Sequence, residues 1–152
     1  TVAVGNFMGR PRTIDYDVIP TGIFTLPEIG RVGLTEQQAR DRCVAAGKDP
    51  QQSVKVGRFR YGGLGKAQAT GDIQGLLKVV ADAESDRILG VHILGAHAAD
   101  LVHEAALAMH LGATVSRVAE MIHAHPTLAE GLMEAMEDVH GYAIHLARKP
   151  SS

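Results

Sequence analysis

Apolar and polar residues change their spacing about two thirds of the way along the chain. Up to residue 94 most apolar residues come in short runs bounded by turn residues, as in β-strands, whereas from residue 96 on they recur every three to four positions, as in helices. Strands followed by helices are typical of layered folds in which the two kinds of element segregate. The pattern predicts an α+β fold, with an antiparallel sheet of about four to five strands packed with about four helices.

The strand signals are runs of β-branched, aromatic and other apolar residues. They predict strands within residues 14–25, ending at 23–25, and in residues 29–34, 53–61, 76–81 and 88–94. In the third run Val54 and Val56 alternate but Phe59 falls on the opposite parity, so a β-bulge is expected at Gly57. Six residues join the last two runs, which allows an antiparallel hairpin but no parallel crossover. Because both runs are apolar on both parities, we expect this hairpin centrally in a sheet covered on both faces.

Capping patterns mark the start of two expected helices. Thr35 and Gln38 form a capping box that opens a helix running to Gly47, a residue that favours a helix end. Thr127 and Glu130 form a second capping box, at the start of the last helix. The four helices are expected in residues 35–47, 96–111, 114–121 and 128–145, with a loop or short helical turn in residues 62–71.

Composition narrows the function classes. The chain has 152 residues, the length of one ordinary domain, and its net charge of -2 argues against a nucleic-acid partner, which would want a basic face. No apolar run reaches the length of a bilayer span. The single cysteine, Cys43, rules out an internal disulfide and suits a reducing compartment, so a cytoplasmic location is expected. Cys43 falls at a helical apolar position, where a small buried hydrophobe is the simplest interpretation.

Several common site motifs are absent or incomplete. No Gly-x-Gly-x-x-Gly fingerprint for a dinucleotide and no Gly-x-Ser-x-Gly nucleophile motif occurs. Residues 62–67 read GGLGKA, but a phosphate loop would need glycine in place of Arg60 and Ser or Thr in place of Ala67. His103 and Glu104 begin like a zinc-protease helix, yet Leu107 stands where the second histidine must fall. The chain by itself therefore contains no complete active site of these classes.

One segment carries candidate chemistry. Residues 123–130 read HAHPTLAE, and the capping box places the Glu130 carboxylate at the same helix end as His125. A helix N-terminus disfavours imidazolium and a nearby carboxylate favours it, so His125 is a candidate for gaining and losing a proton near neutral pH. Pro126 adds rigidity, and a cis His125–Pro126 bond fits so tight a connection. Glu130 as a plain capping residue and His125 as a polar residue before the helix explain the same spacing without catalysis.

The same segment closely resembles the C-terminal signature of the dihydrolipoamide dehydrogenases, a branch of the pyridine nucleotide-disulfide oxidoreductases. The likeness covers nearly the whole chain. Residues 23–36 look like the first segment of that family's interface domain, and residues 89–95, followed by Glu104 in an Ala-rich helix, look like its central hairpin and helix. On this resemblance, residues 1–13 are expected to be the tail of a preceding domain and a connector, 14–146 the interface or dimerisation domain, and 147–152 a C-terminal tail.

The resemblance implies a specific role. In that family a homodimer places this domain against the other subunit's flavin and redox-active cysteine pair. His125 would be the catalytic acid–base, Glu130 would orient it, and His125 and Pro126 would contact the partner's flavin. The complete enzyme would oxidise dihydrolipoamide and reduce NAD⁺ through FAD, and a 2-oxoacid dehydrogenase complex is a further expected partner. The chain alone is expected to be inactive and to hold neither cofactor.

Alternatives remain at this stage. The chain could be a non-catalytic homodimerisation module, or the interface domain of a mercuric reductase-like or transhydrogenase-like relative. Leu26 departs from the family pattern, as does Gly131, whose place in the first turn of a helix is expected to permit a close approach. Eight histidines invite a metal hypothesis, but no cysteine or carboxylate cluster completes a site with His123 and His125, so no metal is expected.

Overall fold

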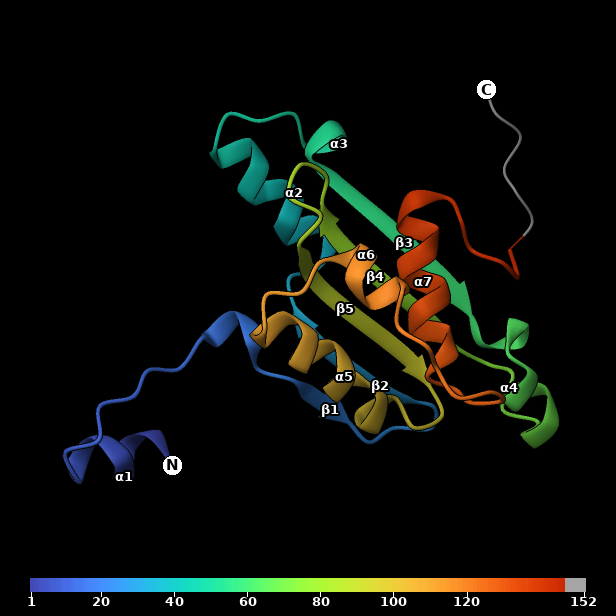
Figure 1. The fold of residues 1–152 in the computed structure, drawn as a ribbon, viewed down its shortest axis with the longest axis horizontal. Coiled ribbons are helices and arrows are strands. Elements are labelled where there is room, and N and C mark those ends of the chain that lie inside the picture. Colours follow the sequence, from blue (N-terminus) through green and yellow to red (C-terminus); the bar gives the residue numbers. More distant parts are fainter. Residues whose placement is uncertain (147–152) are drawn as a thin grey trace.

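The computed structural model describes residues 1–146, and its centre is one antiparallel sheet of five strands in the order β1-β2-β5-β4-β3 (Figure 1). The strands are β1 (Thr21–Ile23), β2 (Glu28–Gly33), β3 (Val54–Arg60), β4 (Leu76–Asp82) and β5 (Ile88–Gly95). The predicted hairpin is β4 and β5, which pair antiparallel and stand in the interior of the sheet, with a register shift between Val80 and Ala81. The expected α+β class, strand number and central hairpin are confirmed.

Seven α-helices surround or flank the sheet in the part of the chain described. They are α1 (Val2–Phe7), α2 (Glu36–Ala45), α3 (Pro50–Ser53), α4 (Gly65–Thr70), α5 (Ala98–His110), α6 (Val115–Ala119) and α7 (Glu130–His140). The four expected helices are α2, α5, α6 and α7, and the three further ones are short. Two 3₁₀ helices, η1 (Tyr16–Val18) and η2 (Tyr61–Gly63), complete the elements. The expected C-terminal tail, 147–152, lies outside the described residues.

Helices cover one face of the sheet and only part of the other, where Leu94 of β5 stays exposed, so the expected cover on both faces is present in part. Helices α5 and α7 lie on one face, α5 over β2 and β5 and α7 over β3 and β4, with α6 packed against α7 (Figure 1). The larger core cluster belongs to this face and contains Val79 and Phe59. A smaller cluster contains Val80 and Val54, packed with α2, and takes in the half-buried Cys43. Cys43 is thus partly, not fully, buried.

The predicted bulge at Gly57 is wrong. Strand β3 pairs with β4 without a register shift, and Gly57 stands opposite Val79. The change of parity arises because β3 buries side chains on both faces, Val54 in the smaller cluster and Phe59 in the larger one. Gly57 itself lies directly under α7, since a Cβ there would come 2.0 Å from the carbonyl oxygen of Ala135.

The capping predictions have different outcomes. Thr35 and Gln38 form the complete capping box of α2. The last helix instead begins at Glu130, with Ala129 and not Thr127 as its N-cap, so Glu130 occupies the first helical position. The Thr127 hydroxyl donates to the carbonyl oxygen of Ala124, while the Thr127 N–H still donates to the Glu130 carboxylate. Only half of the expected capping box is therefore present.

The last helix is also shorter than predicted. It ends at His140, because Gly141 adopts φ of 78°, a left-handed conformation that stops a helix. The close approach expected at Gly131 is present: an added Cβ would lie 2.7 Å from a methyl group of Leu77 on β4. Within residues 1–146, no helix combines the length and the apolar character needed to cross a membrane.

Candidate functional site

The candidate site lies on the connection between α6 and α7. Residues 121–129 have no regular secondary structure, and within them the His125–Pro126 peptide bond is cis, as expected. The connection passes beside the start of α4, where a Cβ built on Gly65 would lie 3.9 Å from Cε1 of His125. Figure 1 shows this connection at the end of the sheet where α4 and the N-terminus of α7 meet.

His125 and Glu130 are in contact. Nδ1 of His125 lies 2.8 Å from Oε1 of Glu130, and the other carboxylate oxygen accepts a 2.8 Å hydrogen bond from the Thr127 N–H. The His125 side chain is 76% exposed, whereas that of Glu130 is 18% exposed. The carboxylate is therefore anchored at the start of α7 and holds a ring that projects into solvent. We call this pair the His125–Glu130 dyad.

The carboxylate of the dyad favours its charged form. Partial burial raises the pKa of Glu130, but hydrogen bonds from the Thr127 N–H and the His125 ring outweigh burial, and charge on His125 and His123 adds to them. The net result is a pKa below the ordinary value. An ionised Glu130 can only accept, so Nδ1 of His125 carries the hydrogen, and in the neutral ring Nε2 is left as a proton acceptor. Nε2 makes no hydrogen bond within the described residues.

A second histidine in the segment has a partner that the sequence did not indicate. Nε2 of His123 lies 2.9 Å from Oε1 of Glu104, and its Nδ1 lies 3.0 Å from the carbonyl oxygen of Met121. The His123 side chain is only 3% exposed. Glu104 comes from α5, nineteen residues earlier. The alternation of histidines at 123 and 125 was the one local signal, and it gave no hint of the partner.

Other histidines pair with carboxylates elsewhere, away from the dyad. These pairs are His97 with Asp100, His140 with Asp86, and His145 with Glu134. Between residues 1 and 146, no group of three His, Cys, Asp or Glu side chains is arranged to hold a metal ion. His123 contacts Glu104 and His125 contacts Glu130, so the two rings do not converge on one metal ion.

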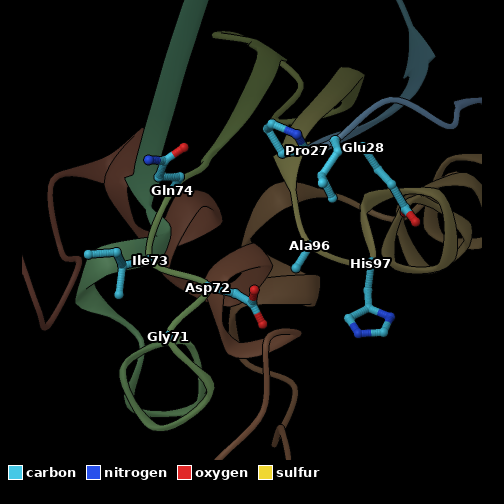
Figure 2. A pocket seen from close by; sticks show the side chains of 9 residues that line it. Pro27, Glu28, Gly71, Asp72, Ile73, Gln74, Ala96 and His97 are labelled. Atoms are coloured by element: carbon cyan, nitrogen blue, oxygen red, sulfur yellow. The ribbon is translucent and has the colours of Figure 1, made fainter.

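The surface also has a hollow of about 800 Å³, which no prediction anticipated. Figure 2 shows residues 71–74 along one wall and Pro27, Glu28, Ala96 and His97 along the other. Neither member of the dyad lines it. Its acidic groups are Glu28 and Asp72, which would repel the pyrophosphate of a dinucleotide. This hollow therefore does not suit the pyrophosphate of FAD or NAD.

Comparison with known proteins places this geometry in context. Residues 19–136 match the family model described as pyridine nucleotide-disulphide oxidoreductase, dimerisation domain. Dihydrolipoyl dehydrogenase of Thermus scotoductus is 46% identical over 97% of the chain, and that of Halobacterium salinarum is 46% identical over 95%. The enzyme of the same name from Bacillus subtilis is 42% identical over 95% of the chain. The chain spans only 30%, 29% and 29% of the length of these relatives, respectively.

Solved structures agree on the fold. A Cu(II) complex of a mutant of the HOCl-induced flavoprotein disulfide reductase from Escherichia coli superposes with a TM-score of 0.77, at 25% identity over 90% of this chain and 30% of that one. LpdA from Mycobacterium tuberculosis gives a TM-score of 0.74 at 20% identity, over 89% of this chain and 28% of that one. The sheet and its covering helices are thus an arrangement known as one part of larger reductases.

Proposed function

The chain belongs to the pyridine nucleotide-disulphide oxidoreductase dimerisation-domain family, and from this premise we propose that it supplies the His125–Glu130 dyad as acid–base group to the active site of a partner subunit. The complete enzyme oxidises dihydrolipoamide to lipoamide and reduces NAD⁺ to NADH, in keeping with the names of the most similar relatives. The observation that carries the proposal is an exposed imidazole held by a largely buried carboxylate.

The stoichiometry of the reaction requires a proton acceptor. Oxidation of a dithiol to a disulfide removes two electrons and two protons. NAD⁺ takes both electrons and one proton as a hydride, so the second proton must leave through another group. Nε2 of His125 projects outward and can take this proton from a thiol of the substrate. In the reverse direction the same nitrogen returns it.

Glu130 has two tasks in this proposal. Its Oε1 fixes Nδ1 of His125 as the donor, so that Nε2 is the nitrogen facing outward. Its negative charge stabilises the imidazolium that forms when Nε2 takes the proton. The hydrogen bond from the Thr127 N–H keeps the carboxylate in place as the ring changes charge. In this role Glu130 resembles the carboxylate of a catalytic triad, which orients the histidine and balances its charge.

The partner subunit is a second copy of the full-length chain. Large apolar side chains stand exposed on α5, directly after it and on the connection after α6, namely Leu107, Leu111 and Ile122. Exposed apolar groups of this size are typical of protein interfaces. FAD, held elsewhere in the dimer, would supply the redox chemistry, and His125 and Pro126 would contact the partner's flavin. The homodimer works in the cytoplasm and can serve a 2-oxoacid dehydrogenase complex, whereas the isolated chain is inactive.

A non-catalytic dimerisation module is the second candidate, favoured by the same exposed apolar residues. The two are separated by dihydrolipoamide turnover in the full-length enzyme carrying His125→Gln. The acid–base role predicts that turnover falls by about 10²–10⁴-fold. His110→Gln, at an exposed histidine at the end of α5, is the matched control and should keep its rate. Unchanged turnover of His125→Gln would leave only the dimerisation role.

A further inference from the structure

The connection between α6 and α7 is attached at both ends by a carboxylate. At its far end Glu130 of α7 accepts from Thr127 and His125. At its near end Glu104 of α5 contacts His123. Between these attachments Ala124, His125 and Pro126 are exposed, as is Ile122 just before them. Within residues 121–126 the side chain of His123 alone points inward, and its 3% exposure contrasts with the 76% of His125 two residues later.

Both ring nitrogens of His123 face acceptor oxygens, one from Met121 and one from Glu104. The carbonyl oxygen of Met121 only accepts, so Nδ1 carries a hydrogen. Nε2 faces a carboxylate oxygen at 2.9 Å, and a hydrogen must lie between them. Both contacts are satisfied together only when a hydrogen lies at each ring nitrogen, one more than a neutral imidazole carries. Such a charge-assisted contact is stronger and shorter than a neutral one.

We propose that Glu104 is a positioning residue for His125: through His123 it fixes the connection that presents the His125 ring, and it touches neither substrate nor the reacting atoms. The expected effect on turnover rests on the proposed function. The claim that Glu104 fixes the position of the His125 ring does not. The charge of His123 is the smallest of the influences on the Glu130 pKa and acts to lower it. Glu104 thereby also keeps a positive group near Glu130.

Two substitutions of Glu104 distinguish the loss of its contact with His123 from a change in the protonation of the His123 ring. In Glu104→Gln the amide can donate to Nε2 of a neutral His123, so the contact survives but the extra proton is lost. In Glu104→Ala both the contact and the proton are lost. Glu120→Ala removes an exposed carboxylate that borders the same connection and serves as control.

The first measurement is ¹⁵N NMR of the imidazole rings in this chain. The unsubstituted chain should show His123 with both ring nitrogens protonated, and a hydrogen-bonded Nδ1–H on His125. Glu104→Gln should convert His123 to a single neutral tautomer while keeping the His125 signal. Glu104→Ala should broaden or remove the His125 Nδ1–H signal, and Glu120→Ala should leave both rings as they were. An unaltered His125 signal in a folded Glu104→Ala chain would overturn the inference.

The second measurement is turnover of the full-length enzyme. Misplacing His125 should lower kcat of Glu104→Ala by about 10- to 100-fold, with a smaller fall in Glu104→Gln and none in Glu120→Ala. The ratio kcat/KM for NAD⁺ should stay constant, because Glu104 is proposed to act on the dithiol half-reaction alone. If His125→Gln abolishes turnover but Glu104→Ala keeps the full rate, the positioning role is wrong and the dyad proposal stands. If His125→Gln itself keeps the full rate, the proposed function fails. The NMR result still decides whether Glu104 fixes the position of the His125 ring.

Discussion

Gly57 on β3 and Ala135 on α7 are in backbone contact across the main core. A Cβ added to Gly57 would lie 2.0 Å from the carbonyl oxygen of Ala135 and 2.7 Å from the backbone nitrogen of Val139. Real side chains do not approach backbone so closely, so the helix rests directly on the strand. Because α7 begins with Glu130, this contact also fixes where the dyad stands relative to the sheet.

Gly57→Ala should therefore displace α7 and destabilise the fold. Overpacking of this kind costs about 1–3 kcal/mol or more, since the obstruction is backbone and cannot rotate away. Urea unfolding followed by circular dichroism measures the loss. Gly62→Ala is the matched control, because its nearest neighbour would be the Ile73 carbonyl oxygen at 3.8 Å. Equal stability of Gly57→Ala and Gly62→Ala would show that α7 does not rest on Gly57.

Gly57 also marks a part of the fold that could not be predicted from the sequence. Periodicity identified the central hairpin and helices α5, α6 and α7 because each buries an apolar run or stripe, whereas the capping box at Thr35 identified α2, which buries only Ala39. It misjudged Gly57, since a parity change in one strand has two causes, a bulge or burial on both faces, and a single strand does not distinguish them. It also missed α3, a single turn whose start is set by Asp49, with Pro50 at the first helical position.

Some contacts of the candidate site could likewise be predicted from the sequence and others could not. The His125–Glu130 contact was predictable because both residues lie near one helix terminus, five positions apart. The exact helix start was not, because the Thr127 hydroxyl turns back to Ala124 and leaves Glu130 as the first helical residue. The contact between Glu104 and His123 joins α5 to a later connection, and such distant pairing depends on how the helices dock on the sheet.

Glu36 joins three elements of the fold. Its carboxylate pairs with Lys78 of β4 at 2.7 Å, Arg58 of β3 at 2.8 Å and Arg40 of α2 at 3.0 Å. The Lys78 hydrogen bond is the largest influence, and with Arg40 and Arg58 it outweighs partial burial and lowers the pKa of Glu36 to about 2. The side chain is 24% exposed, so solvent screens the pairs only in part.

Glu36→Gln should lower the free energy of unfolding at pH 7 by about 2 kcal/mol, after allowance for screening. A carboxyl whose pKa is depressed in the folded state stabilises the protein above its unfolded pKa, near 4.5, and loses this contribution as pH falls through about 2. The difference between the two proteins should therefore shrink from pH 4.5 to 2, as denaturant titrations at several pH values would show. Glu84→Gln, at a side chain 85% exposed, should change little at any pH. A Glu36→Gln difference that is constant with pH would contradict the ion-pair account.

Glu134 attaches the segment after α7 to the core. Its side chain is 1% exposed and accepts from the N–H of Ile144 at 2.9 Å, the N–H of His145 at 3.3 Å and the His145 ring at 2.6 Å. Glu134→Ala leaves these donors without an acceptor and should cost about 1–3 kcal/mol. Amide exchange of Ile144, followed by NMR, should accelerate to the rate of an open chain. Glu137→Ala, one turn along the same helix, should leave that amide protected, and equal exchange in both variants would refute the attachment.

The most direct test of the central claim asks whether His125 acts across a subunit boundary. Full-length chains carrying His125→Gln are mixed with full-length chains in which a cysteine of the redox-active pair, outside residues 1–152, is replaced by serine, so that neither homodimer can turn over dihydrolipoamide. If the dyad serves the partner, the hybrid dimer contains one complete active site, and activity should appear on mixing. Persistent inactivity after verified subunit exchange, or full activity of the His125→Gln homodimer, would contradict the account.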